Sequence, residues 1–411
     1  MALAVILARQ RDVLRSSRGF RLLFGSTLIS GLGTWLAVIA LSVDVFDRTH
    51  SGVWVSALLI ADFLPGVAVG LLLGPLVDRL SRKRLLVGAD LVRLIAFVIL
   101  AQAVDAWQIV ALAFVAGIAT GFARPAVQAG LPNLVSPETL PRANSLLRTA
   151  EQLTITIGTL LGGVAVAADG PDLAYWLNAG SFLFSASLLL RIPGRVLQEG
   201  RVASHGHWRD LAEGIAVVRA SRTLMAVLVA WALVEVGIAL VNVSEVVLAK
   251  VSFNAGDFGF GLMWTATGTG AVIGALFASS WLERRSMTVV YAGAIALMAF
   301  GDAAAAGSPN VWVAVWCILV AGVGNAAAIV CGSLIIQQGA PDHVRGRAFT
   351  LIMGLHFGVL GIGMAVAGPL VDAIGARWVW AIAAGFIAVA SVTAYAMLRR
   401  APAAVPEPAA L

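Results

Sequence analysis

The chain contains 411 residues, of which 60% are apolar or aromatic and only 12% are Asp, Glu, Lys or Arg. Soluble domains carry about 25% charged residues, so this composition excludes a protein that folds in water and indicates one that folds in a bilayer. The formal net charge of +6 does not indicate nucleic-acid binding here, because the basic residues follow a pattern of membrane topology.

Twelve nearly charge-free stretches follow one another along the chain. Each approaches the roughly 20 residues that a helix needs to cross a hydrocarbon core of about 30 Å. We therefore predict an all-α membrane protein with twelve transmembrane helices. The predicted spans are 22–43, 53–77, 86–104, 107–123, 152–168, 173–190, 224–247, 258–282, 287–301, 311–337, 349–371 and 378–398.

The basic residues fall almost entirely on one side of these spans. If the N-terminus is cytoplasmic, 25 of the 28 lysines and arginines lie inside, and only Arg48, Lys250 and Arg377 lie outside. Cytoplasmic loops carry an excess of basic residues, so both termini are predicted to be cytoplasmic. The expected location is the inner (plasma) membrane of a bacterial cell, which the chain crosses many times.

The longest polar segment, 191–222, lies near the midpoint of the chain. Gly163, Gly170 and Gly180 are spaced by 7 and 10 residues, and the same spacings recur 205 residues later at Gly368, Gly375 and Gly385. Such repetition is typical of transporters built from two parallel six-helix halves. We expect an N-terminal six-helix bundle at 1–190, a cytoplasmic linker at 191–222, a C-terminal six-helix bundle at 223–398 and a disordered cytoplasmic tail at 399–411.

A glycine, an aspartate and a run of basic residues occupy the loop between the second and third spans, which reads GPLVDRLSRKR. Glycine lets helices approach closely, aspartate can cap a helix N-terminus, and basic side chains bind carboxylates and lipid headgroups. The loop resembles the signature loop of the major facilitator superfamily, although Ser81 replaces the usual glycine. The resemblance implies a gating role for Gly74, Asp78, Arg79, Arg82, Lys83 and Arg84.

The resemblance covers nearly the whole chain. Segments 131–147, 177–190 and 341–349 are similar to loops and the sixth span of the drug:proton antiporter-3 branch, which includes macrolide and siderophore exporters. Antiporters carry a glycine motif in the fifth span, and Gly158, Gly162 and Gly163 match it. Thr154 and Thr159 replace its first glycine and its proline. The resemblance implies a two-bundle fold, proton-coupled export and a monomer.

Acidic residues within predicted spans need a reason, because an ionisable group at mid-bilayer costs at least about 2.5 kcal/mol. Glu235 lies near the middle of the seventh span, Asp62 lies just before Pro65 in the second, and Asp44 is near the outer end of the first. Each is a candidate proton-coupling residue, and the alternative for each is a hydrogen-bonded structural acid. Glu245 is expected close to the outer surface, in contact with water.

Three further polar residues within spans are candidates for the substrate cavity. Asn242 follows Glu235 by seven residues, which places the two within about 20° of each other around a helix. Asn325 lies in the tenth span and His356 in the eleventh. The alternatives are a helix-packing role for Asn325 and a hydrogen-bonded structural role for His356.

Two opposite charges, Asp90 and Arg93, lie three residues apart in the third span. This spacing brings both side chains to one face of a helix. We therefore predict an intrahelical ion pair rather than a substrate contact.

The sequence contains none of the motifs G-x-S-x-G, H-E-x-x-H or G-x-x-x-x-G-K-[ST]. We expect no enzyme activity, no cofactor and no metal site. The predicted function is secondary active transport by alternating access, most simply proton-coupled efflux of a small amphipathic drug, siderophore or natural product. The expected partners are this substrate, protons and membrane lipids. The alternatives are an uncoupled facilitator or importer, and a non-transporting sensor or assembly protein with the same fold.

Overall fold

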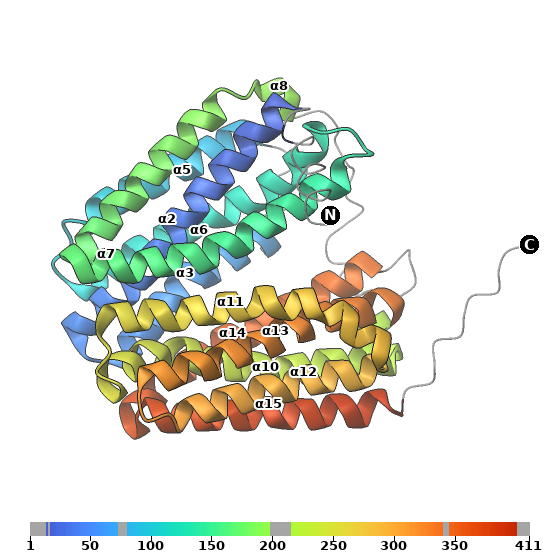
Figure 1. The fold of residues 1–411 in the computed structure, drawn as a ribbon. Helices are drawn as coiled ribbons and strands as arrows, with labels where there is room; N and C mark the ends of the chain where they lie inside the picture. Colours follow the sequence, from blue (N-terminus) through green and yellow to red (C-terminus); the bar gives the residue numbers. More distant parts are fainter. Residues whose placement is uncertain (1–13, 15–16, 73–79, 198–214, 340–344, 401–411) are drawn as a thin grey trace, which may run out of the picture. The chain divides into compact units, whose positions relative to one another are not determined.

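The computed structural model describes residues 14, 17–72, 80–197, 215–339 and 345–400, and the chain is all-α in these ranges, as predicted (Figure 1). Ten helices of this described part are long and apolar enough to cross a membrane. The chain divides into two compact units. Each unit is an α-helical bundle, and the candidate polar groups lie inside these bundles.

Unit 1 comprises residues 1–203 and 249–265. Helix α2 packs along α7, α3 packs along α6, and α5 contacts both α6 and α7. Its elements are α2 (Arg18–Thr49), α3 (Gly52–Leu72), α5 (Arg82–Leu100), α6 (Ala106–Gly130), the 3-10 turn η1 (Leu131–Asn133), α7 (Leu140–Leu190) and α8 (Gly194–Leu197).

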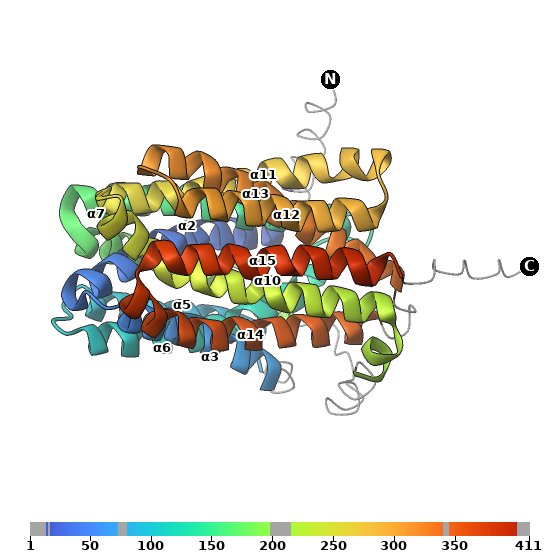
Figure 2. The same cartoon turned by 90° about the horizontal axis from the view of Figure 1, so that it is seen from below.

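Unit 2 comprises residues 204–248 and 266–411, so helix α11 begins in unit 1 and continues in unit 2. Helix α15 packs against both α10 and α12, and α10 also packs against α14 (Figure 2). Its elements are α10 (Arg222–Val247), α11 (Gly256–Arg284) from residue 266 onward, α12 (Met287–Ala306), α13 (Val311–Gly339), α14 (Arg345–Ile374) and α15 (Ala376–Leu398). A π-helical turn (Leu248–Ser252) follows α10 and belongs to unit 1 from residue 249.

Serine side chains start several of these helices. Ser17, Ser81, Ser221 and Ser286 have extended backbones, and each hydroxyl accepts a hydrogen bond from the backbone N–H three residues later. Such N-caps satisfy one of the backbone donors that the first turn of a helix leaves free. The sequence therefore fixes the starts of α2, α5, α10 and α12 locally.

Helix α7 contains a break that separates the fifth and sixth predicted spans. The backbone is non-helical at Asp169 (φ −148°, ψ 25°) and at Gly170 (φ 74°, ψ −177°), and Pro171 follows. Gly375, just before α15, has a similar backbone conformation (φ 81°, ψ 158°). This region of backbone space is accessible essentially only to glycine, so both positions require that residue.

Helix ends that the basic residues assign to the outside are called outer ends below. The outer end of α10 differs from the prediction, because the π-helical turn continues the helix beyond residue 247. The last residues of α10 are consequently buried within the bundle, including Glu245 at 3% exposure. The expectation that Glu245 contacts water was wrong.

Candidate functional site

Glu235 lies on α10 in the interior of unit 2. Nε1 of Trp231, one turn earlier, donates a hydrogen bond to Glu235 Oε1 at 2.8 Å. Glu235 is 9% exposed and Trp231 8%. Trp231 is the one side chain that contributes to the electrostatics of this carboxyl in the part of the chain described. A buried carboxyl held by a neutral donor, without a fixed cation, is able to exchange a proton at low electrostatic cost.

His356 on α14 belongs to the same group. Its ring lies 6.1 Å from the Trp231 ring, and it sits beside the backbone of Leu228. Residues 228, 231 and 235 share one face of α10, and α14 packs against that helix. The structure thus brings Glu235 and His356, which were predicted separately, to either side of Trp231. Sequence reasoning missed Trp231, although its i, i+4 spacing from Glu235 was a usable signal.

Asn242 and Asn325 do not hydrogen-bond to this group within the described ranges. Asn242 is half-buried two turns after Glu235 on α10. Asn325 lies on α13, and its Oδ1 atom is buried without a hydrogen-bond partner among the residues described. Both stay predicted cavity residues.

Two acids share one buried cation in unit 1. Nη2 of Arg93 donates to Oδ1 of Asp90, which confirms the predicted intrahelical ion pair. The Arg93 guanidinium carbon also lies 4.4 Å from the centre of the Phe182 ring, and Asp62 on α3 is within its electrostatic range. Arg93 is only 9% exposed. With both carboxyls ionised this cluster has a net charge of −1, which one proton would neutralise.

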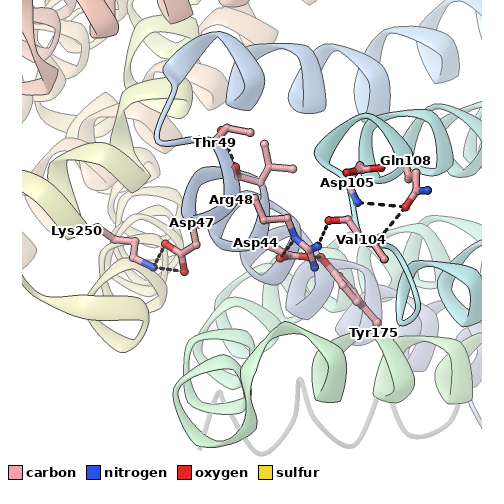
Figure 3. Close-up of polar contacts among 10 residues, drawn as sticks. Asp44, Asp47, Arg48, Thr49, Val104, Asp105, Gln108, Tyr175 and Lys250 are labelled. Carbon is pink, nitrogen blue, oxygen red and sulfur yellow. Dashed lines mark hydrogen bonds and ion pairs between the residues drawn. The ribbon is translucent and has the colours of Figure 1, made fainter.

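Asp44 is held by an ion pair and a phenol near the outer end of α2 (Figure 3). Arg48 donates to Asp44 through Nε at 2.6 Å and through Nη2 at 3.2 Å, and Tyr175 Oη donates at 2.9 Å. A third nitrogen of Arg48 donates to the Val104 carbonyl. A bidentate arginine and a phenol stabilise the ionised carboxylate. This geometry favours the structural alternative for Asp44.

Lys250 forms a second ionic cluster at the same end of unit 1 (Figure 3). Its Nζ atom donates to Asp47 Oδ2 at 2.6 Å and to Asp257 Oδ1 at 2.7 Å. Lys250 lies in the π-helical turn, Asp47 in the last turn of α2 and Asp257 in the first turn of α11. Sequence reasoning missed this cluster, although Lys250 is one of only three basic residues assigned to the outside.

The basic residues of the signature loop bind helix C-termini within unit 1. Arg82 Nη1 donates to the carbonyl of Leu197, the last residue of α8, and Lys83 Nζ donates to that of Leu190, the last residue of α7, both at 2.7 Å. Cations stabilise helix C-termini in this way. Arg84 is exposed. Three residues predicted from the same motif, Gly74, Asp78 and Arg79, lie outside the described residues.

The three glycines of the fifth-span motif face two different neighbours. A Cβ atom on Gly158 would lie 2.8 Å from Trp35 Cβ, and one on Gly162 would lie 2.6 Å from the Leu36 carbonyl oxygen, so both allow α2 to approach α7. Gly163 instead meets α11, where its Cβ would lie 3.0 Å from Gly261 Cα. Glycine at these positions permits close backbone packing between membrane helices.

No metal centre was expected. Groups of three or more His, Cys, Asp or Glu side chains that could hold a metal ion do not occur among the described residues.

The fold is that of membrane transporters and not of enzymes. The chain superposes on a point mutant of the nucleoside transporter NupG with a TM-score of 0.74 at 18% identity, covering 92% of this chain and 99% of that one. A bacterial homologue of the lysosomal transporter Spinster gives 0.72 at 14% identity, covering 93% and 97%. A bacterial homologue of the iron transporter ferroportin gives 0.70 at 15% identity, covering 93% and 99%. These likenesses show that the chain has the fold of such transporters.

Residues 14–408 match the major facilitator family described as transmembrane secretion effectors, and the chain belongs to this family. It is 27% identical to the multidrug efflux pump Tap of Mycolicibacterium fortuitum over 374 residues, which cover 86% of this chain and 89% of the pump. It is 20% identical to macrolide efflux protein A of Streptococcus pyogenes over 365 residues, which cover 87% and 90%. The predicted family and inner-membrane location are confirmed.

Proposed function

We propose that this transporter exports a small amphipathic compound in exchange for protons, by alternating access of its two halves. The observation that carries the proposal is the buried carboxyl of Glu235, which a neutral indole holds and which no cation pairs within the described chain. Such a carboxyl can load a proton when the cavity faces one side and release it on the other. The efflux activity named for the multidrug and macrolide relatives supports the direction of transport.

The proposed topology has twelve spans and cytoplasmic termini. Ten helices of the described chain are long and apolar enough to span. Helix α7 is 51 residues long and breaks at Gly170, so it supplies two spans. Helix α5, with 19 residues, supplies one more in spite of its charges, because Asp90 and Arg93 neutralise each other. Twelve spans return both ends of the chain to the side that holds most of the basic residues.

The second proton-coupling candidate is Asp62, through its shared cation. Asp62 and Asp90 both act on Arg93, so protonation of either acid changes how strongly Arg93 is held by the other. The substrate itself would contact the cavity candidates Asn242, Asn325 and His356, among mostly apolar surroundings. Few polar anchors in an apolar cavity suit amphipathic substrates of varied shape. We expect a monomer that contacts lipids over its exposed apolar side chains.

Flux across proteoliposomes tests the proposal. Wild type and Glu235→Gln are compared under an imposed pH gradient, with macrolides, amphipathic cations and siderophores as probes. Gradient-driven flux is expected in wild type and is expected to be lost in Glu235→Gln, while exchange of substrate without a gradient persists. Glu138→Gln, at an exposed acid outside the spans, is the matched control. Flux that depends neither on the pH gradient nor on the Glu235→Gln substitution would contradict proton coupling.

An uncoupled facilitator or importer is the second candidate, and Thr159 favours it. This residue stands where the antiporter motif has proline, and its hydroxyl donates to the Ile155 carbonyl at 2.8 Å within an unbroken helical turn. It also lies 3.5 Å from the Thr265 hydroxyl of α11. If this candidate is correct, transport should run in the direction of the substrate gradient alone and should be indifferent to Glu235→Gln.

A further inference from the structure

A second pair of buried acids lies in unit 2, apart from Glu235. Glu245 is on α10 and is 3% exposed, and Asp302 is on α12 and is 4% exposed. Each lies within about two turns of the outer end of its helix. Asp302 lies within electrostatic range of Glu245. Helix α15 packs against both α10 and α12 (Figure 2).

One oxygen of each carboxyl has no hydrogen-bond partner among the described residues. Glu245 Oε1 and Asp302 Oδ2 are fully buried and make no hydrogen bond within the described chain. The nearest hydroxyl in sequence, Ser244, is already occupied, because it donates to the Leu240 carbonyl. Polar groups buried at this depth are almost always paired, so two open carboxyl oxygens need an explanation.

No cation of the described ranges forms an ion pair with either acid. Arg377 on α15 donates to the carbonyls of Ala306 and Ser308 at the end of α12, and Lys250 binds Asp47 and Asp257. In the described chain neither acid forms a salt bridge, and the charge that acts on Glu245 is the like charge of Asp302. The other titratable groups on α10 and on the elements packed against α10 and α12 are Arg222, Glu235, Tyr291, Cys317, Cys331, Arg345, Arg347, His356, Asp372 and Tyr395, and Arg399 follows the last residue of α15.

We propose that Glu245 and Asp302 together hold one exchangeable proton, which makes them a second proton-binding site of this chain. Two buried carboxylates without a counter-charge repel each other and lose their hydration. One proton converts one of them to a neutral acid. The charge of the pair then falls from −2 to −1, which removes the repulsion between two buried negative charges.

A proton suits this site better than a metal ion. Hard metal cations take about six oxygen ligands, whereas this pair offers two carboxyls and an occupied serine. The described chain provides no third His, Cys, Asp or Glu to complete a metal site. Sodium binding would therefore overturn the proposal.

The site is distinct from Glu235. Ten residues of α10 separate the two glutamates, which is about 15 Å along the helix. Because both lie on one helix at different depths, a proton entering from the outer end would meet the Glu245–Asp302 pair first. The proposal that the pair is protonated does not depend on export or on any substrate.

Carbodiimide labelling tests the site directly. Dicyclohexylcarbodiimide reacts with protonated carboxyls in apolar surroundings, and mass spectrometry of peptides locates the label. Full-length protein in liposomes is labelled over a range of pH, without substrate. In wild type we expect label on Glu245 or on Asp302, but not on both in the same molecule. We expect this labelling to be lost as the pH rises.

The variants Asp302→Asn and Glu245→Gln show whether the two groups share the proton. Removing one negative charge lets the other carboxyl ionise more readily, so its labelling should disappear about one pH unit lower than in wild type. Glu138→Gln, at an exposed acid, should leave the labelling unchanged. Each variant reports on the labelling of the acid that remains. The experiment can therefore still be made if one of the two variants fails to fold.

Three results would overturn the proposal. The first is label on Glu235 with none on either member of the pair at any pH. The second is that the pH at which half of the labelling of each acid is lost does not change when the other acid is substituted. The third is protection by sodium chloride but not by choline chloride, which would assign the site to a metal cation. A negative labelling result leaves the flux experiment on Glu235 unaffected, so the two proposals fail independently.

Discussion

The indole of Trp231 and the carboxyl of Glu235 are joined by a 2.8 Å hydrogen bond along one face of α10. Both residues are nine-tenths buried, so the bond is shielded from competing water. Trp231 also contacts His356 across the interface with α14. The indole therefore fixes the position of the proposed proton carrier.

Trp231→Phe should impair coupled flux and leave the fold intact. The substitution keeps an aromatic ring but removes the donor, and a hydrogen bond to a charged group contributes about 1.5 kcal/mol, or about tenfold. We expect gradient-driven flux to fall by about this factor. Trp316→Phe, at an exposed position of α13, is the control and should behave as wild type. Equal flux in the two variants would show that the indole does not position Glu235.

Asp44→Asn should destabilise the protein without changing the pH profile of transport. The substitution leaves Arg48 without its carboxylate, and because Arg48 is exposed the lost ion pair should cost about 1 kcal/mol. Tyr175→Phe removes one hydrogen bond and should cost about 1 kcal/mol. Thermal unfolding in detergent measures both. Glu151→Gln breaks an exposed ion pair and should leave the melting temperature unchanged. A shifted pH profile for Asp44→Asn would instead assign proton coupling to Asp44.

Lys250→Met should lower the melting temperature more than Asp47→Asn does. Lys250 binds two carboxylates, and Asp257 still holds it when Asp47 is neutralised. For partly exposed pairs of this kind the coupling energy is about 0.5 to 1 kcal/mol, and it decreases with salt. A double-mutant cycle at low and high ionic strength measures it. Additive effects at low salt would mean that the ion pair contributes nothing to stability.

Gly163→Ala should weaken the contact between α7 and α11. The added methyl would lie 3.0 Å from the Gly261 Cα atom and 3.3 Å from the Asp257 carbonyl oxygen, so the backbones must separate. We expect a lower melting temperature and reduced flux. Gly180→Ala lies on the same helix with nothing within 4 Å of the added methyl, and alanine favours helix there. A Gly163→Ala variant as stable and active as Gly180→Ala would contradict the close contact.

The helices, the family and the Asp90–Arg93 pair could be predicted from the sequence. Span length, charge-free runs and i, i+3 spacing are local signals, and the bilayer makes them strong. The break at Gly170 also follows from glycine and proline chemistry. These features depend on neighbours along the chain, so they need no knowledge of packing.

The partners of the buried acids could not be predicted in the same way. Helices α10 and α13 are apolar on every face, so periodicity does not indicate which side faces another helix. Glu245 was misplaced because the π-helical turn after residue 247 extends the helix. Asp302 was not predicted as a buried acid, because it lies just beyond the end of the predicted ninth span. Both errors concern depth and rotation, which only tertiary packing determines.

Gly170 and Gly375 adopt the same glycine-only backbone conformation, and they lie 205 residues apart. Neither is crowded, since a methyl group on either would meet nothing within 4 Å. The constraint is therefore purely one of chirality: a D-alanine would fit where an L-alanine would not. Every other side chain near these two positions can therefore differ between the two units, while glycine stays the residue that the backbone requires at both.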